Sequence, residues 1–359
     1  MKYILPLLII VSVLEVCGQK YPEVTIPGSH VRYITSSIVA GEEYELHILL
    51  PTGYETATKK YPVVYVMDSQ WDFPLVKSIY GQHYYDGFIP EIIVVGVTWG
   101  GGRVLRTRDY TPPPARTGPQ GETGGADKFL DFMKKELFPF IESNYRAESD
   151  NRTLMGCSLG GLLTLYTLFT HPDMFTGYVA ASPALNWDNG VLNKHAEGFS
   201  QVKLTKPLSV YMTVGDVEVG RQDFENFSNQ LKNKKYNNVR LQSKVLDNTG
   251  HSGTKSETYA RGLQHVFERN QLKLTDAALN KIAGTYRIEK DNREVQIKKE
   301  NGGLTLQVGP QSIPLLADSE HDFYSRNFFL KIHFHEKNNV IDGCEVATFE
   351  ETMTLKKKP

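Results

Sequence analysis

A single serine lies among glycines in the stretch GCSLGG, residues 156–161. The five residues around Ser158 have the form G-x-S-x-G, and they lie between an expected strand and an expected helix. In that context the pattern predicts a nucleophile elbow, a tight turn that exposes the serine hydroxyl at the edge of a sheet. The glycines leave room where two stretches of backbone pass close together. The sequence therefore predicts that Ser158 is a nucleophile near a helix N-terminus, where developing negative charge is stabilised.

A serine hydroxyl is a weak nucleophile without a base, and the chain has ten histidines. His251 differs from the others by its position in DNTGHSG, a polar loop between the last expected strand of a sheet and its last helix. In the chain order serine, acid, histidine of α/β-hydrolases, the base falls at this point. His251 is therefore the predicted general base.

Two carboxylates follow the expected strand that ends at Val214 in SVYMTVGDVEVG. The acid of such a triad holds the tautomer of the histidine and stabilises the imidazolium. Glu218, three residues past the turn glycine, is the preferred acid, and Asp216 stays the alternative. We expect the carboxylate that is not used to cap the helix that begins near Arg221.

An oxyanion requires two backbone N–H donors. The first is expected from Leu159, directly after the nucleophile, and the second from Ser69 or Gln70 in the loop after VVYVMD. Asp68 ends that run, and a negative charge beside an oxyanion would oppose the reaction. Asp68 is therefore expected to brace the loop instead of taking part in catalysis.

Strands and helices alternate along the first two-thirds of the chain. Apolar runs of strand length are found at 31–39, 43–50, 61–68, 92–97, 153–155, 175–181, 208–214 and 239–245. Helical patterns are found at 128–143, 159–170, 221–234 and 254–269. Continuous apolar runs are typical of strands buried on both faces. The alternation predicts an α/β domain over 25–270, an α/β-hydrolase fold with a mainly parallel sheet.

The pattern changes near residue 272. From Ile282 onward, short segments rich in β-branched and aromatic residues are separated by turn signals such as Asn301-Gly302-Gly303. About eight strands in this length predict a small antiparallel barrel-like domain at 282–359. Residues 271–281 are expected to be a linker.

The N-terminus has the features of an export signal. Lys2 is followed by an apolar stretch from Ile4 to Leu14 and by a small residue, Gly18. This stretch is too short to span a bilayer, so 1–18 is predicted to be a signal peptide that directs the protein to the periplasm or the extracellular space. Cys17 as a lipid-anchor site is the alternative, and no integral membrane segment is expected in the mature chain.

Composition excludes other classes of function. The net charge is −1, and no basic stripe indicates a nucleic-acid partner. After cleavage only Cys157 and Cys344 remain, in different expected domains, so neither a disulfide framework nor a cysteine metal site is expected. The predicted chemistry needs no metal or organic cofactor.

Five motifs give the chain a family resemblance over about residues 25–270: YPVVYVMDSQWDF, RTRDYTPPP, GGADKFLDFMKKELFPFIESNYR, GCSLGG and GHSG. It resembles the esterase family of α/β-hydrolases that includes esterase D type enzymes, enterobactin and bacillibactin siderophore esterases, and acetyl-xylan and feruloyl esterases. In that family the segment matching 106–112 lies by the active site. The resemblance implies that Arg106 or Arg108, with Tyr110, lies near substrate; the alternative is an arginine paired with Asp109 that fixes the loop. From IAGTYRI onward, the chain resembles a lipocalin-like β-domain.

The resemblance implies a secreted serine esterase that cleaves carboxylic esters, either siderophore-type or acylated-saccharide esters, through an acyl-enzyme. Trp71, Trp99 and Trp187 suggest an aromatic-lined cleft, with Trp71 as a substrate contact. Two alternatives stay open: an acyltransferase that uses the same triad, and a non-catalytic binding protein of the same fold.

Overall fold

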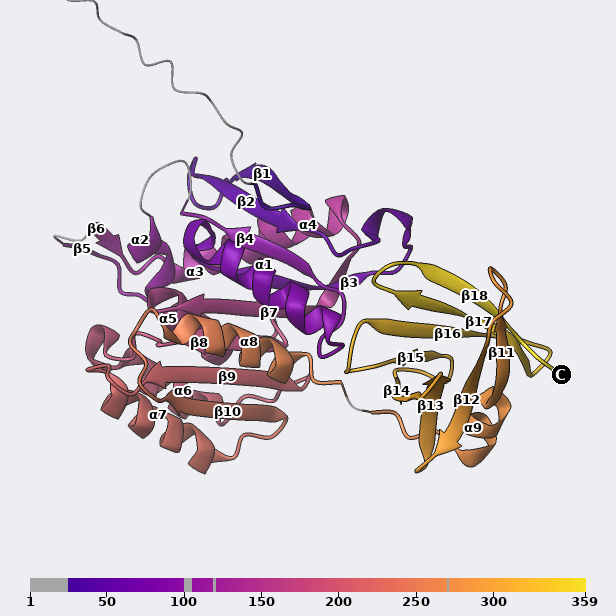
Figure 1. Cartoon of the computed structure of the whole chain (residues 1–359). Helices are drawn as coiled ribbons and strands as arrows, with labels where there is room; N and C mark the ends of the chain where they lie inside the picture. Colours follow the sequence, from indigo (N-terminus) through magenta and orange to yellow (C-terminus); the bar gives the residue numbers. More distant parts are fainter. Residues whose placement is uncertain (1–24, 100–104, 119–120, 270) are drawn as a thin grey trace, which may run out of the picture.

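An eight-stranded, mostly parallel sheet forms the centre of the larger domain (Figure 1). The computed structural model describes residues 25–99, 105–118, 121–269 and 271–359, so the predicted signal peptide with Cys17 lies outside the described residues. The strands are β1 (Ser29–Thr35), β2 (Glu43–Leu49), β3 (Tyr61–Val66), β4 (Ile93–Val97), β7 (Ala147–Cys157), β8 (Gly177–Ala181), β9 (Leu208–Gly215) and β10 (Val239–Leu246). Their order is β1-β2-β4-β3-β7-β8-β9-β10, and β2 is antiparallel to both of its neighbours. The expectation of an α/β-hydrolase fold is confirmed.

Helices cover both faces of the sheet. One face packs against α1 (Ser69–Tyr85) and α8 (Thr254–Val266). The other packs against α3 (Ala126–Phe132), α4 (Phe138–Asn144), α5 (Leu159–Thr170), α6 (Val191–Phe199) and α7 (Arg221–Lys234). Shorter elements are η1 (Tyr54–Thr56), α2 (Arg106–Tyr110), the hairpin of β5 (Arg116–Gly118) and β6 (Gly121–Thr123), and η3 (Trp187–Asn189). Because apolar helices lie on both sides, every residue of β3 is buried, which explains its unbroken apolar sequence.

The helix expected at 128–143 is not one regular α-helix. A π-helical turn, η2 (Met133–Leu137), separates α3 from α4, and Pro139 lies in the first turn of α4. Proline has no N–H to donate and is disfavoured inside a continuous α-helix, whereas the first turn tolerates it.

The C-terminal residues form a closed antiparallel barrel with a core of its own, which confirms the expected small β-domain. Its strands are β11 (Gly284–Ile288), β12 (Glu294–Glu300), β13 (Gly303–Val308), β14 (Gln311–Ala317), β15 (Asp322–Tyr324), β16 (Leu330–Lys337), β17 (Val340–Thr348) and β18 (Thr352–Lys357). In this order each strand pairs with the next, and β18 closes on β11. Within the described ranges, the helices are all too short or too polar to cross a bilayer.

The segment expected to be a linker is partly helical. Helix α9 (Asp276–Ile282) begins after Thr275, whose hydroxyl accepts the N–H of Ala278 at 3.2 Å. Leu279 and Ile282 are buried in the core of the barrel. The expectation of a linker over 271–281 is therefore wrong for most of this segment, because the apolar face of α9 belongs to the barrel.

The barrel contacts the sheet domain at the end opposite the carboxyl end of β7 (Figure 1). Lys331 of the barrel pairs with Glu91 and donates to the hydroxyl of Tyr84 at 3.0 Å, and Phe329 packs on Tyr84. Tyr84 is near the C-terminal end of α1, a helix of 17 residues that spans about 25 Å. The carboxyl edge of the sheet, where β7 ends, is left uncovered by the barrel.

Candidate active site

Ser158 lies in a strained turn between β7 and α5. Its backbone has φ 59° and ψ −116°, a conformation that L-residues rarely adopt. A Cβ atom on Gly156 would come within 2.7 Å of the carbonyl carbon of Gly160, so only glycine permits this close approach. The main chain of Ser158 is also hydrogen-bonded to the end of β8, because its N–H donates to the carbonyl of Ala181 at 3.0 Å. This geometry is that of a nucleophile elbow at the carboxyl edge of the sheet.

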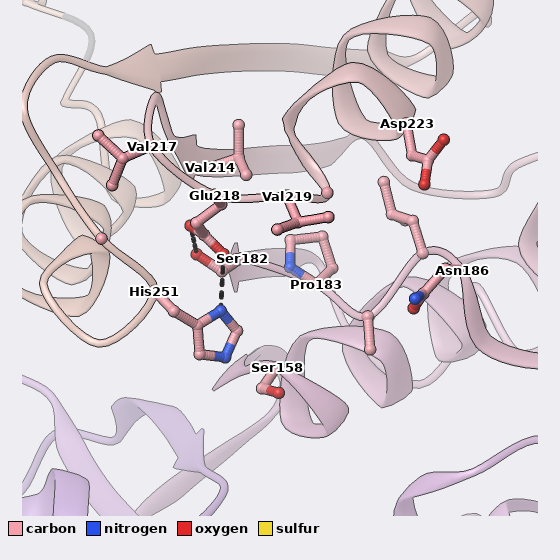
Figure 2. A pocket seen from close by; sticks show the side chains of 14 residues that line it. Ser158, Ser182, Pro183, Asn186, Val214, Val217, Glu218, Val219, Asp223 and His251 are labelled. Carbon is pink, nitrogen blue, oxygen red and sulfur yellow. Dashed lines mark hydrogen bonds and ion pairs between the residues drawn. The ribbon is translucent and has the colours of Figure 1, made fainter.

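His251 and Glu218 meet beside this turn (Figure 2). The Nδ1 atom of His251 lies 2.6 Å from Oε2 of Glu218. The far side of the imidazole ring, with Nε2, faces the side chain of Ser158 (Figure 2). The His251 side chain is half-exposed, whereas that of Glu218 is only 12% exposed. The three residues come from three different loops at the carboxyl ends of β7, β9 and β10.

Glu218 is fixed by more than the histidine. Its second oxygen, Oε1, accepts the N–H of Gly215 at 2.7 Å and the hydroxyl of Ser182 at 2.6 Å. The carboxylate therefore accepts three short hydrogen bonds, and its orientation toward Nδ1 is set from both sides.

Asp216 has a different role from the one expected. Its Oδ1 accepts the N–H of Thr249 at 2.9 Å, and this hydrogen bond is the first cause of a lowered pKa for the half-buried carboxyl of Asp216. It does not cap α7, whose N-cap residue is Gly220 without a side-chain cap. The capping expectation is wrong because Asp216 joins the loop after β9 to the loop after β10.

The amides proposed for the oxyanion hole begin two helices. Leu159 is the first residue of α5, and Ser69 and Gln70 are the first residues of α1. The hydroxyl of Ser69 lies 2.8 Å from Nδ1 of His47, on the side of the sheet core, and Ser69 is buried while Gln70 is exposed. N–H groups in a first helical turn lack acceptors within the helix. These amides are therefore suited to donate hydrogen bonds to an oxygen that develops negative charge.

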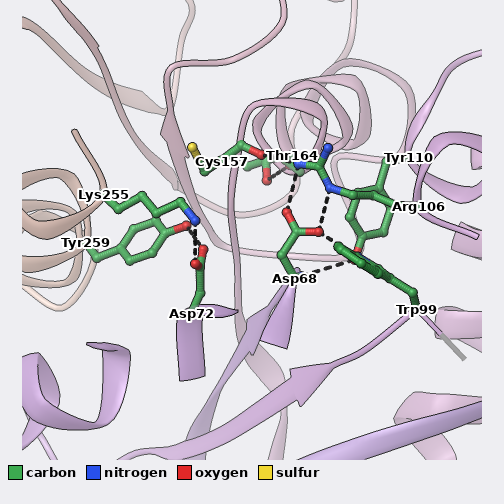
Figure 3. Close-up of polar contacts among 10 residues, drawn as sticks. Asp68, Asp72, Trp99, Arg106, Tyr110, Cys157, Thr164, Lys255 and Tyr259 are labelled. Carbon is green, nitrogen blue, oxygen red and sulfur yellow. Dashed lines mark hydrogen bonds and ion pairs between the residues drawn. The ribbon is translucent and has the colours of Figure 1, made fainter. Parts of the chain in front are cut away.

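A buried ion pair supports the loop before α1 (Figure 3). Asp68, 1% exposed, accepts two hydrogen bonds from Arg106, at 2.7 and 3.0 Å, and one from the indole of Trp99 at 2.8 Å. Arg106 also donates to the carbonyl of Cys157, directly before Ser158, at 3.1 Å. One arginine thus ties the oxyanion loop to the nucleophile elbow.

The residues of α2 have hydrogen-bond partners within the protein. Arg108 donates to Asp109 at 2.7 Å, the alternative that the sequence left open. Tyr110 is buried, and its hydroxyl accepts the N–H of Asp68 at 3.2 Å. These contacts hold Arg106, Arg108 and Tyr110 in place, and a contact of any of them with substrate stays a prediction.

A second buried pair joins α1 to α8. Asp72, 1% exposed, accepts from the ammonium of Lys255 and from the hydroxyl of Tyr259, both at 2.6 Å (Figure 3). The same ammonium lies 5.8 Å from the ring centre of Trp71, which is 58% exposed. Trp71 packs edge-on against Trp99 at 4.5 Å, so this exposed ring is held in place.

A cavity of about 550 Å³ opens beside Ser158 and His251. Its walls are mixed, and the apolar residues that line it are Pro183, Ala184, Leu185, Val214, Val217 and Val219. Of its described lining, the ionisable side chains are His251, Glu218 and Asp223. The described lining of this cavity includes no tryptophan, so an aromatic-lined substrate cleft formed with Trp71, Trp99 and Trp187 stays a prediction. The described ranges also contain no group of three or more histidine, cysteine or acidic side chains placed to bind a metal.

Sequence reasoning missed Ser182 and Thr254, which contact the Glu218 and His251 pair. Ser182 follows β8, and its hydroxyl touches both Glu218 and Thr254. A polar residue directly after a buried strand, at the carboxyl edge of a parallel sheet, was the available signal.

Known proteins resemble this chain most clearly over the sheet domain. A family model described as "Putative esterase" matches residues 36–275. The ferri-bacillibactin esterase BesA of Bacillus subtilis (strain 168) is 33% identical over 213 residues, 54% of this chain and 72% of BesA. The siderophore triacetylfusarinine C esterase of Aspergillus fumigatus is 31% identical over 198 residues, 52% of this chain and 66% of that enzyme.

Solved structures share the fold. A BES protein from Bacillus cereus has a TM-score of 0.61 at 24% identity, covering 69% of this chain and 99% of its own. An IroE-like serine hydrolase from Shewanella oneidensis has a TM-score of 0.61 at 27% identity, covering 67% of this chain and 80% of its own. The family match ends at residue 275, before the barrel begins.

Proposed function

The chain belongs to this esterase family and is an enzyme that hydrolyses esters, and from that premise we propose that it is a serine esterase acting through an acyl-enzyme. The nucleophile is Ser158, the base is His251 and the acid is Glu218. The observation that carries this assignment is the 2.6 Å contact of Glu218 with Nδ1, which turns Nε2 toward the elbow serine.

The reaction has two halves. In the first, Oγ of Ser158 attacks the ester carbonyl as its proton passes to Nε2 of His251, and the oxyanion accepts N–H groups from Leu159 and from Ser69 or Gln70. The tetrahedral intermediate breaks its bond to the alcohol oxygen, which takes the proton from Nε2 and leaves. In the second half, water loses a proton to Nε2 and attacks the acyl carbon. The second tetrahedral intermediate breaks its bond to Oγ of Ser158, which takes the proton back from Nε2, and the acid leaves.

Removal of the nucleophile is the direct test. Ser158→Ala should lower kcat for p-nitrophenyl acetate by about 10⁶-fold, because the acyl-enzyme no longer forms. A fluorophosphonate probe should label Ser158 in the wild type and should not label the variant. Ester turnover that survives in the variant contradicts the proposal, and a wild type that is neither labelled nor active favours the non-catalytic binding protein.

Hydrolysis is favoured over acyl transfer by the exposure of the base. The His251 side chain is 51% exposed, so bulk water reaches the ring that must activate it. Product analysis with an added acceptor alcohol separates the two reactions. Acid release should dominate, and an ester of the acceptor as the main product supports the acyltransferase.

The lining of the cavity favours an uncharged ester group. Glu218 and Asp223 bring negative charge to the described walls, and no described lysine or arginine lines them. A neutral p-nitrophenyl pentanoate should therefore have a kcat/KM at least tenfold above that of the anionic mono-p-nitrophenyl glutarate. Asp223→Asn should narrow this difference, and equal rates in the wild type contradict the argument.

The substrate is proposed to be a siderophore-type or acylated-saccharide ester, which the names of the relatives support for the first class. A panel of feruloylated sugars, acetylated sugars and a cyclic catecholate trilactone, assayed by acid release, distinguishes these classes.

Export is proposed from residues 1–18 and is tested separately. Expression of the full chain with its own N-terminus should give a mature protein outside the cytoplasm that begins at Gln19. Mass spectrometry of the N-terminal peptide distinguishes this product from one that carries a lipid at Cys17.

A further inference from the structure

We propose that Ser182 and Thr254 are positioning residues whose hydroxyls connect Glu218 to the main chain of His251. This inference rests on the proposed triad, since it concerns how the acid and the base are kept aligned. Neither hydroxyl is required to touch substrate.

The connection is a continuous series of short polar contacts. Glu218 bonds Nδ1 of His251 at 2.6 Å through Oε2, and it accepts the hydroxyl of Ser182 at 2.6 Å through Oε1. The Ser182 hydroxyl lies 2.8 Å from Oγ1 of Thr254, and Thr254 donates to the carbonyl of His251 at 2.8 Å. The series therefore leaves the side chain of His251 and returns to its backbone.

The protons can be assigned from donor chemistry. An ionised carboxylate only accepts, so the single hydroxyl proton of Ser182 points to Glu218. Thr254 also has one proton, and its two acceptors, Oγ of Ser182 and the carbonyl of His251, are both 2.8 Å away. Thr254 donates to one of these acceptors at a time, so the two hydroxyls together donate two hydrogen bonds across the three contacts.

Both hydroxyls are buried, which makes them difficult to replace by solvent. Ser182 is 3% exposed and Thr254 is 0% exposed, so water is a poor substitute for either partner. Ser182 has a positive φ of 40° directly after β8, and its N–H donates to the carbonyl of Thr213 at 2.8 Å. Thr254 is the first residue of α8. A strand end and a helix start thus fix the two hydroxyls, while the loop that bears His251 is exposed.

Loss of either hydroxyl should affect the chemical step more than binding. Without Thr254 the carbonyl of His251 loses its anchor, and without Ser182 the Oε1 side of Glu218 keeps only the N–H of Gly215. The misaligned imidazole then accepts the serine proton less well. Thr254 does not line the cavity, and Ser182→Gly removes only the hydroxymethyl group of one lining residue. We expect kcat to fall about 10- to 100-fold, as for the loss of one hydrogen bond to a charged group, with KM within about twofold.

The experiment uses the full chain and p-nitrophenyl acetate. Thr254→Val removes the hydroxyl, Thr254→Ser restores it, and Thr258→Val is the matched control one helical turn later. Thr258 is equally buried; its hydroxyl lies 2.5 Å from that of Thr213 and donates to the backbone carbonyl of Thr254 at 2.6 Å, so it contacts the main chain of Thr254 but is not one of the hydroxyls of the series. Ser182→Gly removes the other hydroxyl and suits the positive φ. Melting temperatures are measured for every variant.

The proposal expects low kcat in Thr254→Val and Ser182→Gly, near-normal kcat in Thr254→Ser, and a smaller loss in Thr258→Val at a similar melting temperature. Equal loss in Thr254→Val and Thr258→Val, or no loss in Ser182→Gly, overturns it. If Thr254→Val does not fold, Ser182→Gly decides the question. Failure of the proposed function is separate, because it appears as a wild type without serine-dependent turnover.

Discussion

The choice between the two carboxylates after β9 gives the sharpest test of the site. Glu218→Gln and Asp216→Asn make the same chemical change, a carboxylate to an amide, two residues apart on one loop. The structure predicts opposite outcomes for them, because Glu218 bonds His251 whereas Asp216 bonds the N–H of Thr249.

The magnitude follows from the donors around Glu218. Oε1 receives the N–H of Gly215 and the hydroxyl of Ser182, so a glutamine places its single carbonyl oxygen at this position. Its NH₂ group then faces Nδ1 of His251 and donates to it. Nδ1 becomes the acceptor, Nε2 carries the proton, and His251 can no longer accept a proton from Ser158. A wrong tautomer of this kind lowers kcat about 10⁴-fold, equivalent to about 5 kcal/mol in the barrier.

The assay is steady-state hydrolysis of p-nitrophenyl acetate with the melting temperature as a check on folding. Asp216→Asn should keep kcat within about threefold of the wild type, because an amide oxygen still accepts the N–H of Thr249. The reasoning is refuted if Glu218→Gln keeps more than a tenth of the wild-type kcat, or if Asp216→Asn is the variant that loses activity.

Three further outcomes are expected. Ion pairing with Lys331 outweighs the burial of Glu91 and lowers the pKa of Glu91 from 4.5 to about 2, so its stabilisation is complete above about pH 5 and is lost as the pH falls toward 2. Glu91→Gln should therefore flatten the acid side of the melting temperature against pH, and an unchanged slope contradicts this. Burial raises the pKa of the Cys157 thiol to about 12, so N-ethylmaleimide at pH 7 should leave esterase activity and the mass of the native protein unchanged. Arg106→Met leaves Asp68 buried without its ion pair and should reduce the free energy of unfolding in urea by about 3–5 kcal/mol, with a parallel fall in kcat.

Much of the fold was predictable because the sheet is buried on both faces. The run at 61–68 is apolar without alternation for that reason, and α7 occupies the predicted range 221–234. Helix α6 was not predicted, and α9 was taken for a linker. Both helices are short, so their few apolar residues do not form a recognisable helical pattern, and the helices are stabilised by the surfaces on which they pack.

Local motifs indicated the candidate nucleophile and base, whereas contacts between residues far apart in the chain could not be predicted from the sequence. The turn around Ser158 brings Gly156 and Gly160 close together, so the glycine pattern that predicts this turn lies within five consecutive residues. The assignment of these residues to catalysis stays a prediction. The partner of Arg106, by contrast, lies 38 residues away in the chain, and only folding brings it into contact.

Ser182 and Asp216 show the same limit. Ser182 lies 36 residues before its carboxylate partner, so nothing near it in the sequence marks its contact. As the carboxylate not used in the triad, Asp216 was expected to cap α7. The parallel strand β10 ends beside Asp216 instead, and the loop after β10 supplies the N–H of Thr249.

The attachment of the barrel at the end opposite the carboxyl end of β7 has a practical consequence for handling the enzyme. The last strand, β18, belongs to the barrel, so a fusion partner or a solid support joined at Pro359 is held on the side away from the carboxyl edge of the sheet, where the proposed active site lies. Bulky esters then approach from open solution, and an enzyme tethered in this way should keep the turnover of the free protein.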